Sequence, residues 1–254
     1  MEKITTLKIQ TSKSQHQNIV MLTAYDYPFA RILDKAGVDI VLVGDSLGNV
    51  ALGYRDTLPV TMAEMVIHTQ AVARAVQRAL VVADLPFGSF QVGEQQAVAN
   101  AIKLVKAGAE AVKIEGTEYL SAIKKILQAG IPVMGHVGFT PQSVNKLGYK
   151  VQGRDKKSAA RIMRDAKALA EAGCFAIVVE MVPGELAAKI TRALKIPTIG
   201  IGAGNNVDGQ VLVLNDLLGL YDNPPSFAKP ILNLKSLILQ ALKKYIARAR
   251  SSTG

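Results

Sequence analysis

The sequence has little cysteine, little histidine and no long apolar run, and each shortage excludes a class of protein. Its 254 residues include one cysteine, Cys174, which forms no disulfide within the chain and favours a reducing compartment. No apolar run approaches the roughly 18 uncharged residues that a membrane-spanning helix needs. The opening stretch MEKITTLKIQTSKSQ also lacks the apolar core of a secretory signal. We therefore expect a cytoplasmic protein without a membrane partner.

Basic residues are in excess, which gives the chain a formal net charge of +10. A basic surface attracts phosphate, so nucleic-acid binding is one hypothesis. The basic residues are instead scattered over expected helix surfaces, with clusters at 154–157 and 243–250 and few aromatic residues between them. We interpret the charge as solvated helix surface that also attracts an anionic small-molecule substrate, and we expect no nucleic-acid partner.

Short runs rich in Val, Ile and Leu alternate with longer segments of helical period. Each run is almost continuously apolar, as expected for a parallel strand buried on both faces and unlike the alternation of a half-exposed antiparallel strand. The expected strands are 19–25, 39–45, 80–86, 111–116, 132–138, 175–180, 197–204 and 210–216.

Helices are expected between these strands, and several end in a glycine-containing turn such as KAGVD or EAGCF. Eight strands with intervening helices in about 250 residues are typical of an α/β protein with a (β/α)8 TIM barrel. A doubly wound sheet stays open as the alternative, because periodicity does not show closure. No linker divides the chain, so we expect one barrel domain over 1–254. A polar N-terminal extension or helix is expected at 1–18 and an amphipathic C-terminal helix at 228–250.

Polar side chains gather where the expected strands end, although the strands themselves are apolar. They are the acids Asp26, Asp45, Asp84, Glu115 and Glu180, together with Tyr25, Ser46, Lys113 and His136. In a barrel, the C-terminal ends of the strands carry the active site. Five carboxylates at one rim repel one another unless protons or a cation compensate them. Carboxylate oxygens and water suit Mg²⁺, whereas the three histidines and one cysteine lack the paired spacing that zinc prefers.

The stretch VGDSLG admits two interpretations. Gly-Asp-Ser-Leu is the signature of one group of serine hydrolases, in which the serine, here Ser46, attacks an ester. That chemistry needs a histidine base late in the chain, but the last histidine is His136. We therefore favour Asp45 as a metal ligand, with Ser46 holding the substrate, over a serine nucleophile.

Nine segments of the chain resemble the ketopantoate (3-methyl-2-oxobutanoate) hydroxymethyltransferase family. They are LTAYDYPFA, VGDSLGNV, TLPVTMAEM, ADLPFGSF, VKIEG, GHVGFTPQSV, VQGR, VVEMVPGELA and IGIGAGNNVDGQVLVLNDLLG. No single motif is decisive, but their joint order is highly specific. The resemblance implies a (β/α)8 barrel that transfers a hydroxymethyl group from the co-substrate 5,10-methylenetetrahydrofolate to 3-methyl-2-oxobutanoate. The product is 2-dehydropantoate (ketopantoate), in pantothenate and coenzyme A biosynthesis, and the enzyme is a homo-oligomer, often a decamer.

The resemblance also assigns ligand-binding roles to residues at the strand ends. It implies Mg²⁺ bound by Asp45, Asp84 and Glu115, where the ion stabilises an enolate of the 2-oxo acid. It implies substrate contacts from Asp45, Ser46, Asp84 and Lys113. A purely structural alternative for Lys113 is that it pairs with Glu115, and both roles are compatible.

The resemblance makes Glu180 the general base that removes the proton from C3 of the substrate. Its apolar neighbours in FAIVVEMVP disfavour the charged form, which would strengthen it as a base. A salt-bridged structural acid is the alternative for this position. Tyr25, Asp26 and His136 are expected to support the metal and its waters, or the ligands, through hydrogen bonds.

The chain departs from the family pattern at two places. The loop NKLGYKVQGR has one glycine where the family has a pair, and Asn215 stands at the expected end of the eighth strand where the family commonly has histidine. Neither departure removes an expected catalytic residue. The nearest alternative function is a Mg²⁺-dependent C–C lyase or mutase of the phosphoenolpyruvate mutase/isocitrate lyase type. Those enzymes usually carry a Lys-Lys-Cys-Gly-His loop, which this sequence lacks.

Overall fold

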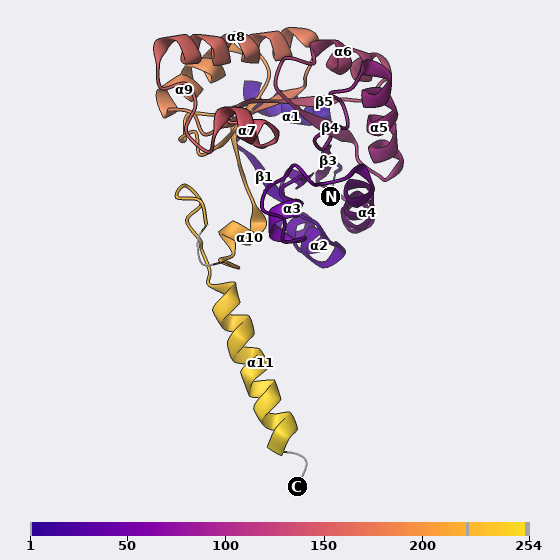
Figure 1. Ribbon diagram of the computed structural model, residues 1–254, viewed down its shortest axis with the longest axis vertical. Helices are drawn as coiled ribbons and strands as arrows, with labels where there is room; N and C mark the ends of the chain where they lie inside the picture. Colours follow the sequence, from indigo (N-terminus) through magenta and orange to yellow (C-terminus); the bar gives the residue numbers. More distant parts are fainter. Residues whose placement is uncertain (1, 222–223, 252–254) are drawn as a thin grey trace. The chain divides into compact units, whose positions relative to one another are not determined.

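The structure is a computed structural model that describes residues 2–221 and 224–251. The chain divides into two compact units, Met1–Val211 and Leu212–Gly254 (Figure 1). The first unit contains all of the expected site residues, and the second contains the C-terminal helices. The expectation of one domain over 1–254 stays a prediction.

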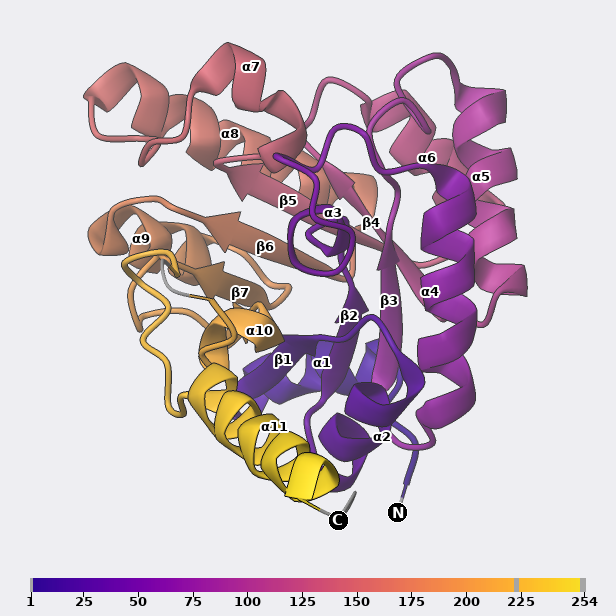
Figure 2. The same ribbon diagram turned by 60° about the horizontal axis from the view of Figure 1, so that its bottom comes forward.

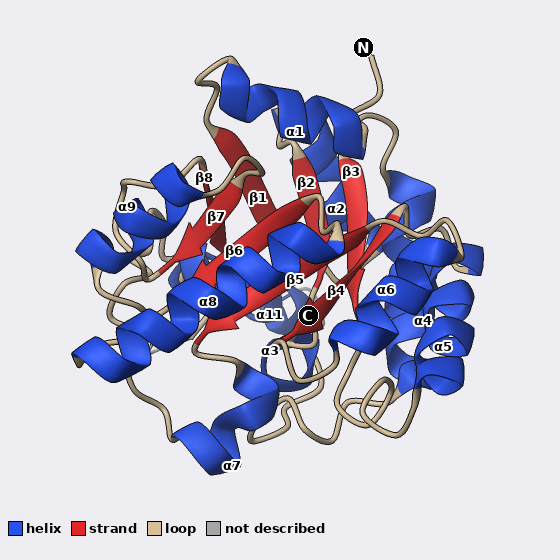
Figure 3. Cartoon of the chain, turned by 90° about the horizontal axis from the view of Figure 1, so that it is seen from above, coloured by secondary structure: helices blue, strands red, loops and turns tan. Residues whose placement is uncertain are grey.

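Eight parallel strands form a closed barrel in chain order (Figure 3). They are β1 (Ile19–Thr23), β2 (Ile40–Val43), β3 (Leu80–Asp84), β4 (Ala111–Glu115), β5 (Val133–Gly138), β6 (Ala176–Glu180), β7 (Thr198–Ile201) and β8 (Gly209–Leu212). Consecutive strands pair in parallel from β1 to β8. The (β/α)8 barrel is confirmed, because a doubly wound sheet would leave two open edges.

Most helices of the first unit surround the strands, whereas the first helix contributes Ile9 to the buried cluster inside the barrel. The helices of this unit are α1 (Thr6–Ser14), α2 (Tyr27–Ala36), α3 (Leu47–Val50), α4 (Met62–Ala75), α5 (Glu94–Lys106), α6 (Leu120–Gln128), η1 (Pro141–Ser143), α7 (Val144–Leu147), α8 (Lys156–Ala172) and α9 (Gly184–Ala193). Local signals set their ends: Thr61 and Glu64 form a capping box at α4, and Gly173 ends α8 in the left-handed conformation that suits glycine. Helices α4, α5 and α6 lie side by side, and α8 packs over β5 and β6 (Figures 1 and 2).

Several expected boundaries differ from the structure, most of them by one to three residues at strand ends, and three differences are larger or bear on named residues. The eighth strand ends at Leu212, so Asn215 lies in α10 (Leu214–Leu217) rather than at a strand end. The chain turns into this helix at Val213, whose carbonyl accepts hydrogen bonds from the N–H groups of Asp216 and Leu217. The long connection expected after the fifth strand, 137–157, contains η1 and α7. The C-terminal helix is α11 (Leu234–Ser251), which starts after 228 because Asn233 accepts a hydrogen bond from the Ser236 N–H and caps it.

The second unit consists of α10, α11 and the segment that joins them. The N–H groups of Ile231 and Leu234 donate to the carbonyls of Leu217 and Leu218, which folds the chain back against α10. No residue of α11 is buried. Among the described helices of both units, none combines the length and apolar character needed to cross a membrane.

The barrel interior explains how the polar residues reach one place. Side chains alternate between the interior and the helix-facing surface along a strand. The interior cluster includes Met21, Ile40, Leu42, Leu80, Val82, Ala111, Met134, Ala176, Val178, Ile199 and Val211. Two residues further along their strands, Val82 is followed by Asp84, Ala111 by Lys113, Met134 by His136, and Val178 by Glu180. The apolar interior therefore turns polar at the C-terminal end of the barrel.

Candidate active site

A polar layer of five side chains covers the interior at the C-terminal ends of β3 to β6. The strand register places Asp84 beside Lys113 and Glu115 beside His136, while Glu180 ends β6 beside Gly138. Asp84 and His136 are 2% exposed, and Lys113 and Glu115 are 5% exposed. Charges buried to this extent need partners, so the pairing within the layer decides their protonation.

Lys113 and Asp84 form the central ion pair of the layer. The Nζ of Lys113 lies 2.9 Å from the Oδ1 of Asp84. Burial lowers the pKa of Lys113, but the surrounding carboxylates of Asp84, Glu115 and Asp45 outweigh burial and raise it above its ordinary value. Burial raises the pKa of Asp84, although Lys113 opposes that shift. Lys113 is therefore a fixed positive charge at neutral pH, and its ion pair is with Asp84 rather than Glu115.

Asp45 follows β2 and lies against this pair. Its backbone N–H donates to the Oδ2 of Asp84 at 3.0 Å, and its Oδ2 accepts from the Nε2 of Gln142 at 2.8 Å. Burial, followed by repulsion from Asp84 and Glu115, raises the pKa of Asp45 well above its ordinary value. The carboxylates of Asp45, Asp84 and Glu115 thus repel one another, and a cation would relieve that repulsion.

His136 connects two of the acids. Its Nδ1 lies 3.4 Å from the Oε1 of Glu115, and its Nε2 lies 3.1 Å from the Oε2 of Glu180. Burial and the charge of Lys113 lower the pKa of His136, but the contacts with Glu115 and Glu180 outweigh them and raise it to about 9. Burial raises the pKa of Glu115, while His136, Lys113 and the Gln142 N–H bring it below its ordinary value. An imidazolium between two carboxylates is therefore the favoured state at neutral pH.

Ser46 lies beside this layer at the start of α3, and its hydroxyl is 2.8 Å from the hydroxyl of Tyr25. His68, on α4, donates from Nδ1 to the carbonyl of Tyr25 at 2.6 Å and so supports the loop after β1. Within the described residues, no histidine hydrogen-bonds to Ser46. A serine nucleophile therefore lacks its base, and a binding role for Ser46 fits better.

The carboxylates fit a hard divalent cation by their chemistry. The Oδ1 of Asp84 and the Oε1 of Glu115 are buried without a hydrogen bond in the described part of the chain, and their contacts with Lys113 and His136 are ion pairs only. In residues 2–221 and 224–251, no three His, Cys, Asp or Glu side chains are already gathered as around a metal. Asp45, Asp84 and Glu115 nevertheless offer oxygen ligands of the kind Mg²⁺ prefers.

Comparison with known families matches residues 3–253 to the model for ketopantoate hydroxymethyltransferase. The chain belongs to the ketopantoate hydroxymethyltransferase family. Two relatives, each named 3-methyl-2-oxobutanoate hydroxymethyltransferase, agree over nearly their whole length. The protein of Pyrobaculum calidifontis is 54% identical, and the alignment covers 92% of this chain and 89% of the relative. The protein of Carboxydothermus hydrogenoformans is 52% identical, and the alignment covers 98% of this chain and 92% of the relative.

Solved structures with the same fold are far more distant in sequence from this hydroxymethyltransferase. A phosphonopyruvate hydrolase in complex with oxalate and Mg²⁺ superposes with a TM-score of 0.66 at 15% identity, covering 100% of this chain and 89% of that one. A 2,3-dimethylmalate lyase of the phosphoenolpyruvate mutase/isocitrate lyase superfamily superposes with a TM-score of 0.62 at 16% identity, covering 99% of this chain and 89% of that one. At this identity the likeness concerns the barrel and not its chemistry.

One expected site residue of the hydroxymethyltransferase lies away from the polar layer. The Asp26 side chain is exposed and accepts a hydrogen bond from the Phe29 N–H as the N-cap of α2. This is the ordinary use of an aspartate at a helix start. The strand-end pattern brings Asp45, Asp84 and Glu115 together but not Asp26, because β1 ends at Thr23 and Asp26 caps the helix that begins at Tyr27.

Gln142 is a site residue that no sequence prediction singled out. Its Nε2 donates to the Oδ2 of Asp45 at 2.8 Å and to the carbonyl of Leu85 at 2.9 Å, and its backbone N–H donates to the Oε2 of Glu115 at 3.0 Å. It therefore holds two carboxylates from one position in η1. The segment GFTPQSV that contains it follows the fifth strand, but an uncharged side chain carries no signal of its own there.

Proposed function

We propose that the chain transfers a hydroxymethyl group from 5,10-methylenetetrahydrofolate to 3-methyl-2-oxobutanoate and so produces 2-dehydropantoate for pantothenate and coenzyme A biosynthesis. Membership of the hydroxymethyltransferase family supports the reaction. The observation that carries the proposal is the acid–imidazole–acid arrangement of Glu180, His136 and Glu115 beside a buried lysine. Removing a proton next to a keto group needs a base at the carbon and positive charge at the oxygen.

Glu180 is the proposed base. Its side chain is 13% exposed, whereas those of Asp84 and Glu115 are 3% and 4% exposed, so it is the acid of the layer most open to a bound substrate. The contact with His136 fixes one carboxylate oxygen and leaves the other for the proton at C3. Before the transfer His136 balances the charge of the Glu180 carboxylate, and the removed proton would then rest on Glu180 as the neutral acid.

Asp45, Asp84 and Glu115 are the proposed Mg²⁺ ligands. When bound, Mg²⁺ supplies positive charge that stabilises an oxyanion developing on a 2-oxo acid. Lys113 adds a second, fixed positive charge from the chain itself, and Ser46 and Asp84 border the same space. We propose that Lys113 and Ser46 hold the substrate's carboxylate and keto group, with Asp45 and Asp84 in contact with substrate as well.

Hydrogen exchange tests the enolate step without the folate. In D₂O, the protein is expected to replace the C3 proton of 3-methyl-2-oxobutanoate by deuterium in the presence of Mg²⁺, followed by proton NMR. Treatment with EDTA should abolish the exchange, and added Mg²⁺ should restore it. Absence of exchange with Mg²⁺, even after tetrahydrofolate is added, would undermine the base and metal roles and favour the lyase or mutase alternative.

We also propose that the protein forms a homo-oligomer through α11, with a decamer as one such assembly. Leu237, Ile238, Leu242 and Tyr245 are 43–70% exposed on this helix, although an amphipathic helix ordinarily buries its apolar stripe. Light scattering after gel filtration should give a multiple of the 27.1 kDa chain mass. Ile238→Glu/Leu242→Glu should lower that multiple, whereas Gln240→Glu, on the opposite side of the same helix, should not. A wild-type monomer, or an assembly unchanged by the double substitution, would contradict the proposal.

A further inference from the structure

Gln142 contacts all three chain segments that carry the proposed Mg²⁺ ligands. Its Nε2 donates to the Oδ2 of Asp45, which follows β2, and to the carbonyl of Leu85, the residue after Asp84. Its backbone N–H donates to the Oε2 of Glu115, at the end of β4. Gln142 is only 7% exposed, so water competes little for these bonds. One buried residue therefore ties together the C-terminal ends of β2, β3 and β4.

These hydrogen bonds engage one oxygen of each acid. Gln142 holds the Oδ2 of Asp45 and the Oε2 of Glu115, and the Asp45 N–H holds the Oδ2 of Asp84. Within the described residues, the Oδ1 of Asp84 and the Oε1 of Glu115 are buried without a hydrogen bond. A carboxylate that is fixed through one oxygen keeps the other for a cation. Partners that orient metal ligands in this way typically change metal affinity by about tenfold to a hundredfold when they are removed.

A second glutamine, Gln91, sets the direction in which the Gln142 amide faces. The Oε1 of Gln91 accepts from the N–H groups of Gly88 at 2.8 Å and Phe90 at 3.3 Å, in the loop after β3. Its Nε2 therefore faces Gln142 and donates to the Oε1 of Gln142 at 3.3 Å. Because an amide has its acceptor and its donors on opposite sides, Gln142 then presents its NH₂ group to Asp45. The loop after β3 is thus connected to the carboxylates through two amides.

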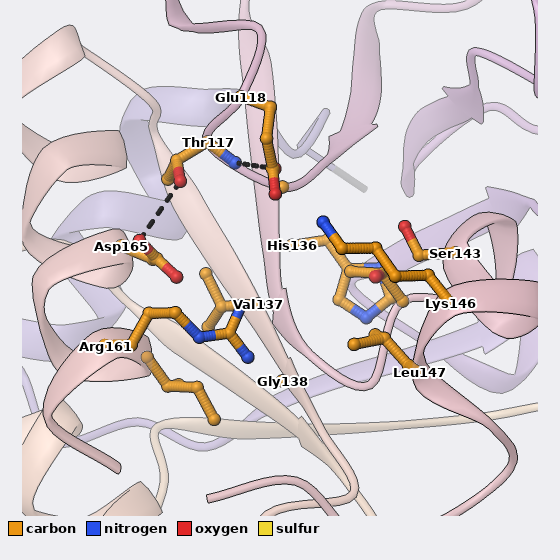
Figure 4. A pocket seen from close by; sticks show the side chains of 13 residues that line it. Thr117, Glu118, His136, Val137, Gly138, Ser143, Lys146, Leu147, Arg161 and Asp165 are labelled. Atoms are coloured by element: carbon orange, nitrogen blue, oxygen red, sulfur yellow. Dashed lines mark hydrogen bonds between the residues drawn. The ribbon is translucent and has the colours of Figure 1, made fainter. Parts of the chain in front are cut away.

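The residues next to Gln142 in the chain have different surroundings. Thr140 and Ser143 line a small polar pocket beside His136 (Figure 4). Gln142 is not among the described residues that line this pocket, and its side chain contacts Asp45 instead. Contact with the acids is therefore particular to the side chain at position 142, and a substitution there leaves the residues of the pocket in place.

We infer that Gln142 and Gln91 are positioning residues of the Mg²⁺ site. Gln142 holds the three segments that carry Asp45, Asp84 and Glu115, and Gln91 keeps the Gln142 amide turned toward Asp45. Both act through the carboxylates and neither is itself a ligand. The inference rests on the proposed function, which assigns these three acids to Mg²⁺.

Metal affinity without substrate tests the role of Gln142. Mn²⁺ is the probe, because it takes the same oxygen ligands as Mg²⁺ and its free concentration is measured by electron paramagnetic resonance. In EDTA-treated protein, Gln142→Met is expected to raise the Kd for Mn²⁺ about tenfold to a hundredfold. Methionine is unbranched and of similar length, but it donates no hydrogen bond to Asp45 or Leu85. The Mg²⁺ concentration for half-maximal C3 exchange should rise by a similar factor.

Gln91→Glu separates positioning from a simple effect of charge. Its carboxylate can still accept the N–H groups of Gly88 and Phe90, but it cannot donate to Gln142. A negative charge added near a cation site strengthens cation binding. Loss of the hydrogen bond that orients Gln142 weakens it, so we expect a Kd for Mn²⁺ about threefold to tenfold higher. Gln96→Glu adds the same charge at an exposed position of α5 and should match the wild type.

Other results would overturn the inference in distinguishable ways. Wild-type Mn²⁺ affinity in Gln142→Met, with a lowered melting temperature, would make Gln142 a packing residue only. Binding of Mn²⁺ by Gln91→Glu as tight as in the wild type, or tighter, would refute the role of Gln91. A wild type that binds no Mn²⁺ would refute the metal assignment of the three acids, and the positioning roles with it. Mn²⁺ binding without C3 exchange in the wild type would refute the proposed reaction alone, because the affinity comparison needs no substrate.

Discussion

Glu180→Gln is expected to lower both C3 hydrogen exchange and overall turnover by about 10²- to 10⁴-fold, the contribution typical of a positioned general base. Glutamine keeps the size of the side chain and can place its amide oxygen against the Nε2 of His136, where Glu180 has its carboxylate. It cannot take the proton from C3. Because exchange and turnover share this step, both should fall by similar factors, measured by proton NMR in D₂O and by product formation.

The matched control for this variant is Glu185→Gln, which removes the same charge from an exposed position in the first turn of α9. It should leave both rates near the wild-type values, and the melting temperature of Glu180→Gln should stay close to that of the wild type. Exchange that survives in Glu180→Gln would transfer the role of base to another group. A loss of turnover with full exchange would instead place Glu180 in the folate half of the reaction.

The barrel could be predicted from the sequence because its strands are buried on both faces. A parallel strand covered by helices outside and by other strands' side chains inside appears in the sequence as an unbroken apolar run. Eight such runs indicate an α/β protein of barrel size, whereas closure of the sheet is established by the strand pairing in the structure. The predicted eighth strand extends too far, to 216, because apolar residues continue past Leu212 into the short helix α10. Hydrophobicity alone does not distinguish a strand from a buried helical turn.

The candidate site was predictable where it depends on position along a strand. Asp84, Lys113, His136 and Glu180 each lie two residues beyond an interior apolar residue, so the alternation of the strand places them in one layer. Their pairing was not predictable, because it depends on the register between strands. Lys113 shares β4 with Glu115, yet its ion pair is across the sheet with Asp84.

The positions of residues that follow the strands depend on the loops. There the sequence pattern includes a residue that lies outside the site and misses one that lies within it. Asp26 follows β1 as Asp45 follows β2, but Asp26 caps a helix in solvent while Asp45 is buried against Asp84. Gln142 reaches two acids from a 3-10 turn after β5. A side chain that acts through hydrogen bonds to buried carboxylates can be recognised only once those carboxylates are located.

The buried pair of Lys113 and Asp84 leads to a prediction about stability as well as activity. Asp84→Ala is expected to abolish turnover and to lower the free energy of unfolding by about 3–5 kcal/mol, measured by urea denaturation. The loss arises because the ammonium of Lys113, 5% exposed, remains buried without its nearest counter-charge. Removing one partner of a buried pair is costlier than removing both, since the remaining charge cannot reach water.

The double variant Asp84→Ala/Lys113→Met therefore tests whether the uncompensated charge of Lys113 causes the loss of stability. It removes both charges and keeps an apolar side chain of similar length in place of the lysine, so it should recover most of the lost stability and none of the activity. Lys8→Met, which breaks an ion pair with Glu2 in which the side chains are 44% and 81% exposed, should change the unfolding free energy by less than about 1 kcal/mol. If the double variant were as unstable as Asp84→Ala, the cost would lie in the lost packing of Asp84 and not in an uncompensated charge. If Asp84→Ala were as stable as the wild type, Glu115 and Asp45 would be sufficient partners for Lys113, and Asp84 would be a ligand-binding residue without a structural role.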